Sequence, residues 1–249
     1  MRLLALIYGA VCYLGFFIAF LYLIAFAGGE MIPLLRVPKT VDWGASPVPA
    51  DFAVLANIGL LLLFGVQHSI MARQSFKRAW TKVVPKTVER STFVLATTLV
   101  LVALYYYWTP LPAIVWELQS PLWSTALTAF FVAGFAVVLL STFLIDHFEL
   151  FGLAQVWRAF SGKEEAPPVF RTPLFYKGVR HPLYLGFLIA FWATPTMTAG
   201  HLLFAAIWTG YIFVAIGYEE RDLVRLFGDQ YRRYMARVPM IFPFGAGRE

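Results

Sequence analysis

Long runs without charge alternate with short polar segments along the whole chain. Four of these runs have about 18 to 25 residues, enough for one helix to cross a hydrocarbon core of about 30 Å. They cover Leu3–Ala27, Phe52–Ile70, Ser91–Trp108 and Leu122–Ile145. The pattern therefore predicts four transmembrane helices in residues 1–145.

A fifth run, His181–Tyr218, has no Lys, Arg, Asp or Glu and is too long for one crossing. Pro195 and Gly200 lie near its middle, so we expect a turn over residues 194–200. Two legs of about 17 residues each would give about six crossings in total. Because the first leg is short, a re-entrant first leg is an alternative.

A polar C-terminal segment follows this expected hairpin. Gly228 is suited to end the exit helix, and Asp229 is suited to cap the start of the next one. Apolar residues then recur at helical spacing, at Tyr231, Tyr234, Met235 and Val238. The spacing predicts a short amphipathic helix that lies on the membrane or covers a site.

Composition supports a membrane protein. Hydrophobic residues make up 60% of the chain and charged residues 14%, against about 25% charged in a soluble domain. We expect an all-α fold, a polytopic helical bundle that forms one membrane-embedded domain over residues 1–249. The formal charge of +6 is typical of basic loops on one side of a membrane, so no nucleic-acid partner is expected.

Charge also predicts the orientation. With six crossings, Arg36 and Lys39 alone among the 20 basic residues fall on the side opposite the two termini. The positive-inside rule then places both termini in the cytoplasm. The single cysteine, Cys12, excludes an internal disulfide, and four histidines without cysteine partners predict no metal site.

The segment Y-K-G-V-R-H-P-L-Y-L-G, residues 176–186, enters the hairpin. Pro182 pushes His181 out of helical geometry and suits the first helical position. Arg180 and His181 then stand beside a helix N-terminus, which favours an anion. Glu219 and Glu220 follow the hairpin and can accept hydroxyls or face a cation. A ligand with a carboxylate, a ribose and a positive centre fits between the two ends, and S-adenosylmethionine is such a ligand.

These two stretches also carry a resemblance. R-H-P-x-Y-x-G followed by E-E-x-x-L-x-x-x-F-G-x-x-Y-x-x-Y-x-x-x-V-P is similar to the C-terminal half of isoprenylcysteine carboxyl methyltransferases, integral membrane enzymes that use S-adenosylmethionine. The resemblance implies a cofactor-binding half over residues 146–249. It implies cofactor contacts by Gln155, Tyr176, Arg180, His181, Pro182, Leu183, Tyr184, Glu219 and Glu220. Sterol reductases that use NADPH carry a looser form of the motif, so a reductase stays an alternative.

The substrate half of that family's pattern is missing here. Residues 168–171 read P-V-F-R where the family has a His-x-Leu-Val run, and Ala215 stands where it has an arginine. We therefore do not expect a prenylcysteine substrate.

A second resemblance covers nearly the whole chain. The segments 37–42, 67–73, 89–95, 141–157 and 191–204 are similar to those of bacterial methanethiol S-methyltransferases, which convert methanethiol to dimethyl sulfide. This resemblance implies S-adenosylmethionine, a small thiol substrate and a place in the lipid bilayer of the bacterial inner membrane. It points to no obligate protein partner. A non-enzymatic membrane transporter is the remaining alternative.

Three residues are candidates for the chemistry on a thiol. Asp146 and His147 end the fourth span, and His68 ends the second on the same expected side of the membrane. Attack on a sulfonium methyl needs the thiolate, so a base or a cation that stabilises the thiolate would help. The alternative is structural, with Asp146 capping a helix and each histidine packed at the interface.

Overall fold

The structure is a computed structural model that describes residues 1–46, 48–164 and 167–243. Residue 47, between the first two expected spans, and residues 165–166 and 244–249, in the expected cofactor-binding half, lie outside it. The helices are α1 (Arg2–Gly28), α2 (Ala50–Ala72), α3 (Gln74–Trp80), α4 (Glu89–Tyr107), α5 (Pro121–Ile145), α6 (His147–Leu150), α7 (Leu153–Ser161), α8 (Pro182–Trp192), α9 (Ala199–Phe227) and α10 (Asp229–Arg237). Short 3₁₀ turns are η1 (Gly29–Met31), η2 (Lys86–Val88) and η3 (Leu174–Lys177). Strands β1 (Ile114–Glu117) and β2 (Thr196–Thr198) pair with each other.

Five of the described helices are long and apolar enough to span a membrane. They are α1, α2, α4, α5 and α9, and the first four start and end within two residues of the expected spans. The fold class predicted from the sequence, an all-α polytopic membrane bundle, is therefore confirmed. The chain is an integral membrane protein.

The first leg of the hairpin is shorter than predicted. α8 has 11 residues, not about 17, and so rises only about 16 Å. Pro195 explains the difference, because a residue before proline avoids helical geometry and the helix must stop ahead of it. Residues 193–198 continue outside a helix and can reach up to about 20 Å when extended. The helices are interrupted at residues 193–198, within which 196–198 form β2, so the expected turn at 194–200 lies partly in a strand and ends inside α9, which begins at Ala199.

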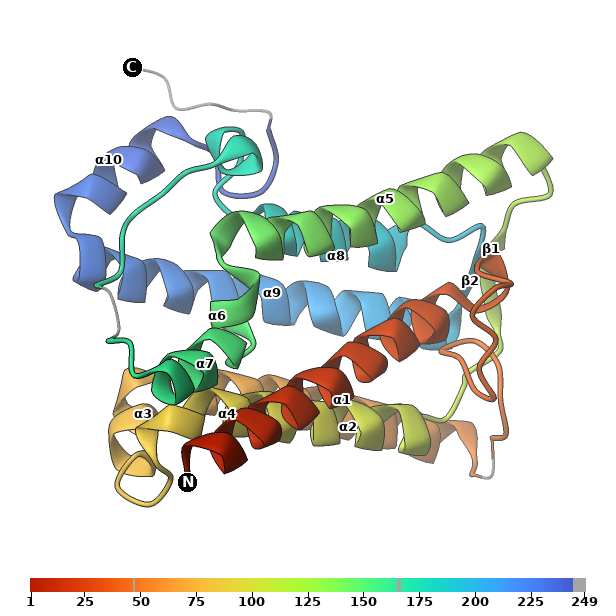
Figure 1. Cartoon of the computed structure of the whole chain (residues 1–249). Coiled ribbons are helices and arrows are strands. Elements are labelled where there is room, and N and C mark those ends of the chain that lie inside the picture. The colour runs from red at the N-terminus through yellow and green to blue at the C-terminus, as the bar shows by residue number, and fades with distance from the viewer. Residues whose placement is uncertain (47, 165–166, 244–249) are drawn as a thin grey trace. The chain divides into compact units, whose positions relative to one another are not determined.

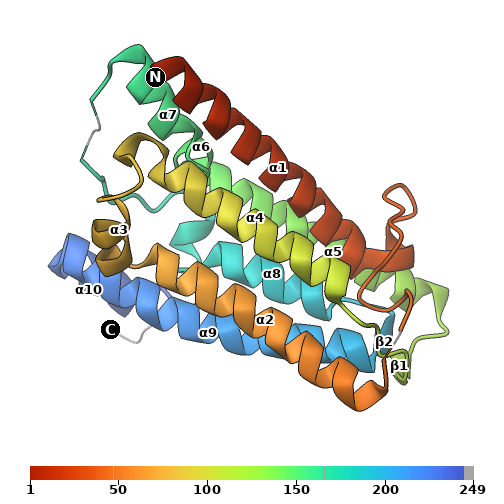
Figure 2. The same ribbon diagram turned by 90° about the horizontal axis from the view of Figure 1, so that it is seen from below.

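The described chain separates into two compact units. Unit 1 comprises residues 1–115, 146–167 and 198–204, and unit 2 comprises residues 116–145, 168–197 and 205–249. In unit 1, α4 packs against both α1 and α2, and Figure 2 shows it between them. α7 packs on α1 where Gly9 leaves room, since a Cβ there would lie 2.6 Å from a methyl of Val156.

A polar network closes one end of unit 1. Thr198 donates to Oδ1 of Asp42 at 2.6 Å, and Nδ1 of His201 lies 3.1 Å from Oδ2. Nearby, Asn57 both donates to and accepts from the backbone of Thr109, at 2.7 and 3.0 Å. His201 and Asn57 are fully buried, so these contacts satisfy groups that burial would otherwise penalise. These contacts give His201 a structural role in unit 1.

In unit 2, α5 and α8 pack backbone against backbone. A Cβ on Gly134 would lie 2.7 Å from the carbonyl oxygen of Gly186, and a Cβ on Gly186 would lie 2.6 Å from that of Gly134. Small residues allow such close approach between membrane helices. The glycine in the R-H-P-L-Y-L-G segment therefore serves this helix contact.

The last two helices of unit 2 meet at a glycine. α9 ends at Phe227, and Gly228 takes a positive φ of 56°, as expected for a residue that ends a helix. α10 then turns away from the end of α9 (Figure 1). The capping role predicted for Asp229 is wrong, because Gly228 occupies the cap position and Asp229 is already helical. Its carboxylate instead accepts from Arg232 at 2.7 Å.

Candidate functional site

The stretch before α8 and the acidic stretch on α9 meet in unit 2. Arg180 Nε donates to Oε1 of Glu220 at 2.7 Å, and the two side chains are only 11% and 12% exposed. Nε2 of His181 lies 3.0 Å from the same oxygen. The sequence-based expectation that these two polar stretches lie side by side is thereby confirmed.

Arg180 also holds the segment that follows α10. Its Nη1 donates to the carbonyl oxygens of Met235 and Val238, at 3.1 and 2.6 Å. The backbone N–H of Arg180 donates to Pro239 at 2.9 Å, and that of His181 donates to Met240 at 3.1 Å. Three parts of unit 2 are joined here, namely the N-terminus of α8, the last turns of α9 and the chain after α10. We call these contacts the arginine node.

The helix beside the node starts as its sequence requires. His181 is not helical, with φ −127° and ψ 64°, and Pro182 occupies the first turn of α8. Proline costs nothing there because that N–H has no helical partner. Pro182 is buried, whereas Leu183 and Tyr184 are half-buried on the first turn.

Glu219 is the more exposed of the two neighbouring glutamates. Its side chain is 44% exposed, and Oε2 lies 4.0 Å from Nδ1 of His181. Burial, and then the charge of Glu219, raise the pKa of the Tyr176 hydroxyl well above its usual value. Tyr234 donates to the carbonyl of Tyr176 at 2.5 Å, and burial raises the pKa of Tyr234 to about 12. Both phenols therefore stay neutral at physiological pH, and that of Tyr234 serves as a hydrogen-bond donor.

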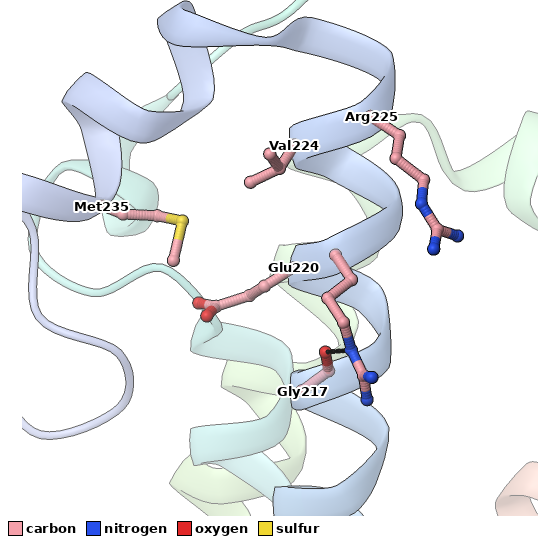
Figure 3. A pocket seen from close by; sticks show the side chains of 6 residues that line it. Gly217, Glu220, Val224, Arg225 and Met235 are labelled. Carbon is pink, nitrogen blue, oxygen red and sulfur yellow. Dashed lines mark hydrogen bonds between the residues drawn. The ribbon is translucent and has the colours of Figure 1, made fainter.

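A groove of about 340 Å³ lies against the node between α9 and α10. Figure 3 shows Glu220 and Val224 of α9 and Met235 of α10 pointing into it, and Arg225 is also among the lining residues. Arg221 lines it too, with its Nε bonded to the carbonyl of Gly217 at 2.8 Å. The volume is at the lower end of the range of about 300 to 1,000 Å³ for small-molecule sites.

The other candidate residues lie in unit 1. Nε2 of His147 is 2.8 Å from the hydroxyl of Tyr13 on α1, and its ring packs edge-on against Phe151. Burial lowers the pKa of His147, partly offset by the charge of Asp146. A neutral imidazole at physiological pH can accept a proton. Asp146 accepts from the backbone N–H of Glu149 at 3.1 Å, so it caps α6.

Gln155 and Glu149 are both engaged with arginines of unit 1. Oε1 of Gln155 accepts the backbone N–H of Arg90 at 3.0 Å, at the start of α4. Oε1 of Glu149 accepts from Nη2 of Arg158 at 2.8 Å, within a bidentate pair. This bond to Arg158 holds the pKa of Glu149 below its usual range.

His68 has a separate set of neighbours. Its ring stacks on Phe64 at 5.3 Å between centroids and packs against Phe93 at 4.9 Å. Nδ1 lies 3.4 Å from the hydroxyl of Thr97. His147 is thus held against α1 and His68 against α4.

Comparison with known proteins gives matches over nearly the whole chain. Methanethiol S-methyltransferase 1 of Bradyrhizobium diazoefficiens is 53% identical over 243 residues, which are 98% of this chain and 83% of that protein. Methanethiol S-methyltransferase of Mycobacterium tuberculosis is 52% identical over 243 residues, 98% of this chain and 97% of that protein. The chain belongs to the methanethiol S-methyltransferase family.

A more distant match places this methanethiol S-methyltransferase family member in a wider context. Nurim of Homo sapiens is 34% identical over 186 residues, 70% of each protein. That match fits the isoprenylcysteine carboxyl methyltransferase-like superfamily indicated by the R-H-P and E-E motifs. No protein-family model and no solved structure matches the chain.

Sequence reasoning on this methanethiol S-methyltransferase family member missed several neighbours of the candidate residues. Tyr13 and Arg158 were not singled out, although they contact His147 and Glu149. Arg90 lies in the segment 89–95, which carries part of the family resemblance, but the sequence pattern gave this residue no role. Arg90 sits at the start of a span, and an ionisable side chain in that setting is a functional signal by default. That rule could have selected Arg90, but not Tyr13.

Proposed function

We propose that this chain transfers the methyl group of S-adenosylmethionine to methanethiol, yielding dimethyl sulfide and S-adenosylhomocysteine. The reaction would take place at the cytoplasmic face of a bacterial inner membrane. The observation that carries this proposal is the 52–53% identity, over 98% of the chain, to proteins named methanethiol S-methyltransferase. Over such a length the catalytic machinery is expected to be shared.

The arginine node suits the donor molecule. A methionine carboxylate needs a cation, and Nη2 of Arg180 makes no hydrogen bond within the described residues, whereas Nε and Nη1 are engaged. Ribose hydroxyls or an ammonium need an exposed carboxylate, and Glu219 supplies one next to His181. When bound, S-adenosylmethionine supplies an electrophilic methyl group on a sulfonium. Tyr176 and Tyr184 offer rings to that positive charge.

The remaining residues that the sequence assigned to the cofactor would assist its binding indirectly. Pro182 and Leu183 form the first turn of α8, whose free N–H groups favour the carboxylate. Glu220 orients Arg180 and His181. Gln155 fixes the start of α4 through the N–H of Arg90, so its effect on the cofactor would be indirect.

The thiol must lose its proton before it attacks. His147 is the first candidate base, because burial lowers its pKa and a neutral imidazole can accept a proton. His68 is the second candidate, and Asp146 acts on His147 through its charge. The chain's contribution to the rate would otherwise be orientation of the thiol and exclusion of water.

The distribution of charge supports a reaction on the cytoplasmic side. Arg36 and Lys39 lie in the loop between α1 and α2, and the other 18 of the 20 basic residues fall on the side of the termini if the segment 182–198 crosses the membrane. The positive-inside rule then makes the termini cytoplasmic. The methyl donor would be drawn from that compartment.

Calorimetry with S-adenosylhomocysteine tests the proposal and its nearest rival. We expect binding to the wild type and weaker binding to Glu219→Gln. Asp229→Asn is a matched control, because it removes one carboxylate from an exposed site in the same unit. Tight binding of NADPH without binding of S-adenosylhomocysteine would instead identify a reductase. Solute flux in vesicles without methyl transfer would identify a transporter.

A further inference from the structure

Arg90 is a half-buried cation at the start of α4, and two of its groups, the backbone N–H and Nε, are hydrogen-bonded within unit 1. Its Nε donates to the carbonyl of Leu150 at 2.8 Å, and its backbone N–H donates to Gln155. In the described part of the chain, its terminal nitrogens Nη1 and Nη2 make no hydrogen bond. A guanidinium carries five N–H donors, so one fixed through Nε keeps four for a ligand.

An aromatic seam leads from Arg90 between α2 and α4. The guanidinium carbon lies 5.1 Å from the ring centre of Phe93, whose ring packs against His68 at 4.9 Å. His68 in turn stacks on Phe64, and Thr97 reaches its Nδ1. Positions 64 and 68 on α2, and 90, 93 and 97 on α4, follow helical spacing and so share one face of each helix. The seam is lined by the rings of Phe64, His68 and Phe93, and it ends at the cationic side chain of Arg90.

The charges around Arg90 leave an excess of positive charge. Glu89 of α4 and Glu149 of α6 act on its guanidinium, and Lys77 of α3 stands near both Arg90 and Glu89. Glu149 is already engaged in the bidentate pair with Arg158 of α7. Three cations therefore face two carboxylates in this part of unit 1. A small anion with an apolar body matches both the excess charge and the seam.

We propose that Arg90 binds the thiol substrate as its thiolate, with the methyl group of the thiol in the seam beside Phe93 and His68. The inference rests on the proposed function and names the residue that receives its substrate. The thiol gives its proton to a neutral histidine or to solvent. The thiolate sulfur then forms a bond to the donated methyl carbon. The old bond from that carbon to the sulfonium breaks, and its electron pair stays on the departing sulfur, which becomes a neutral thioether.

Thiolate formation can be measured without the methyl donor. Ultraviolet difference absorbance reports the pH at which methanethiol bound to the protein ionises, in the wild type and in Arg90→Gln. An opposite charge at short range lowers an acid's pKa by about one to three units. We expect Arg90→Gln to move the midpoint upward by at least about one unit, toward the value of the free thiol near 10. An unchanged midpoint overturns the inference.

Turnover gives a second readout with a matched control. Losing a charge-assisted contact to the thiolate should lower kcat/KM for methanethiol by about ten- to a hundredfold in Arg90→Gln. Lys77→Gln removes one positive charge from the neighbouring α3 and should change kcat/KM less than about threefold. Equal losses in both variants overturn the inference, because they would show a general effect of charge.

One measurement needs no variant, in case Arg90→Gln does not fold. In the wild type, methanethiol at a pH above its midpoint should protect Arg90 from phenylglyoxal, as located by peptide mass mapping. Failure of methanethiol to protect Arg90 overturns the inference. Failure of the proposed function is distinguishable, since the wild type would then bind no S-adenosylhomocysteine and form no dimethyl sulfide.

Discussion

Arg180 and Glu220 form a buried ion pair in unit 2, with Nε and Oε1 separated by 2.7 Å and side chains 11% and 12% exposed. The arginine would be costly to bury alone, and so would the carboxylate. Together with the carbonyls of Met235 and Val238, the pair fixes the start of α8 relative to the chain after α10. The residues expected to hold the cofactor therefore also hold unit 2 together.

Removing the carboxylate of Glu220 should weaken both folding and binding. Glu220→Ala leaves Arg180 buried without its partner, which commonly costs about 3 to 5 kcal/mol. We expect a clearly lower apparent Tm in detergent and weaker binding of S-adenosylhomocysteine. Asp229→Ala breaks an exposed pair and should cost less than about 1 kcal/mol. Equal losses of Tm and of affinity in the two variants would show that the arginine node contributes no more than an exposed ion pair.

The helix contact at Gly134 and Gly186 should tolerate no side chain. Gly134→Leu puts a Cβ 2.7 Å from two backbone atoms of α8, and overpacking of this kind costs about 1 to 3 kcal/mol or more. Gly210→Ala on α9 is the control, because its Cβ would meet nothing within 4 Å. Thermal unfolding should show a lower Tm for the first variant and an equal or higher Tm for the second. A lower Tm for Gly210→Ala than for Gly134→Leu would contradict the close packing of α5 on α8.

The network of Asp42, Thr198 and His201 should stabilise unit 1 without taking part in the reaction. Asp42→Ala removes the acceptor for a buried histidine and a threonine, at a cost of about 1 to 3 kcal/mol. We expect a lower Tm, with KM for methanethiol and affinity for S-adenosylhomocysteine unchanged at temperatures where the protein is folded. A large change in either constant would assign this network to the site.

The pH–rate profile tests His147 as the base. Because burial lowers its pKa, a rate that depends on neutral His147 should rise with pH through a midpoint below about 6.5 and then level off. Its folded pKa lies below the unfolded value, so stability should fall as pH drops through that range. His147→Gln should remove both effects, and His68→Gln should not. A rate that keeps rising toward pH 10 in all three proteins would show that neither histidine is the base.

Most of the fold could be predicted, because long uncharged runs indicate the membrane spans and Gly and Pro residues indicate where helices end. The limits of α5 and the stop at Gly228 followed from them. The length of α8 was not predicted correctly. Pro195 ends the helix several residues ahead of itself, and the apolar run continues past that point without a change in composition. Asp229 failed as a cap because Gly228 already takes the required backbone geometry.

The candidate site was only half predictable for a different reason. Arg180, His181 and Glu220 could be paired in advance, because a hairpin of two helices returns the chain to its starting side. The contact of Tyr13 with His147 could not, because it depends on how α1 and α6 pack, and no local pattern encodes that. The free donors of Arg90 are likewise visible only once Leu150 and Gln155 are in place.

Product formation is the most direct measurement of the central claim. Purified protein in detergent is incubated with S-adenosylmethionine and methanethiol, and the headspace is analysed for dimethyl sulfide by gas chromatography. The account predicts dimethyl sulfide in proportion to enzyme and time, with an equal amount of S-adenosylhomocysteine in solution. Folded protein that binds S-adenosylhomocysteine but forms no dimethyl sulfide would contradict it.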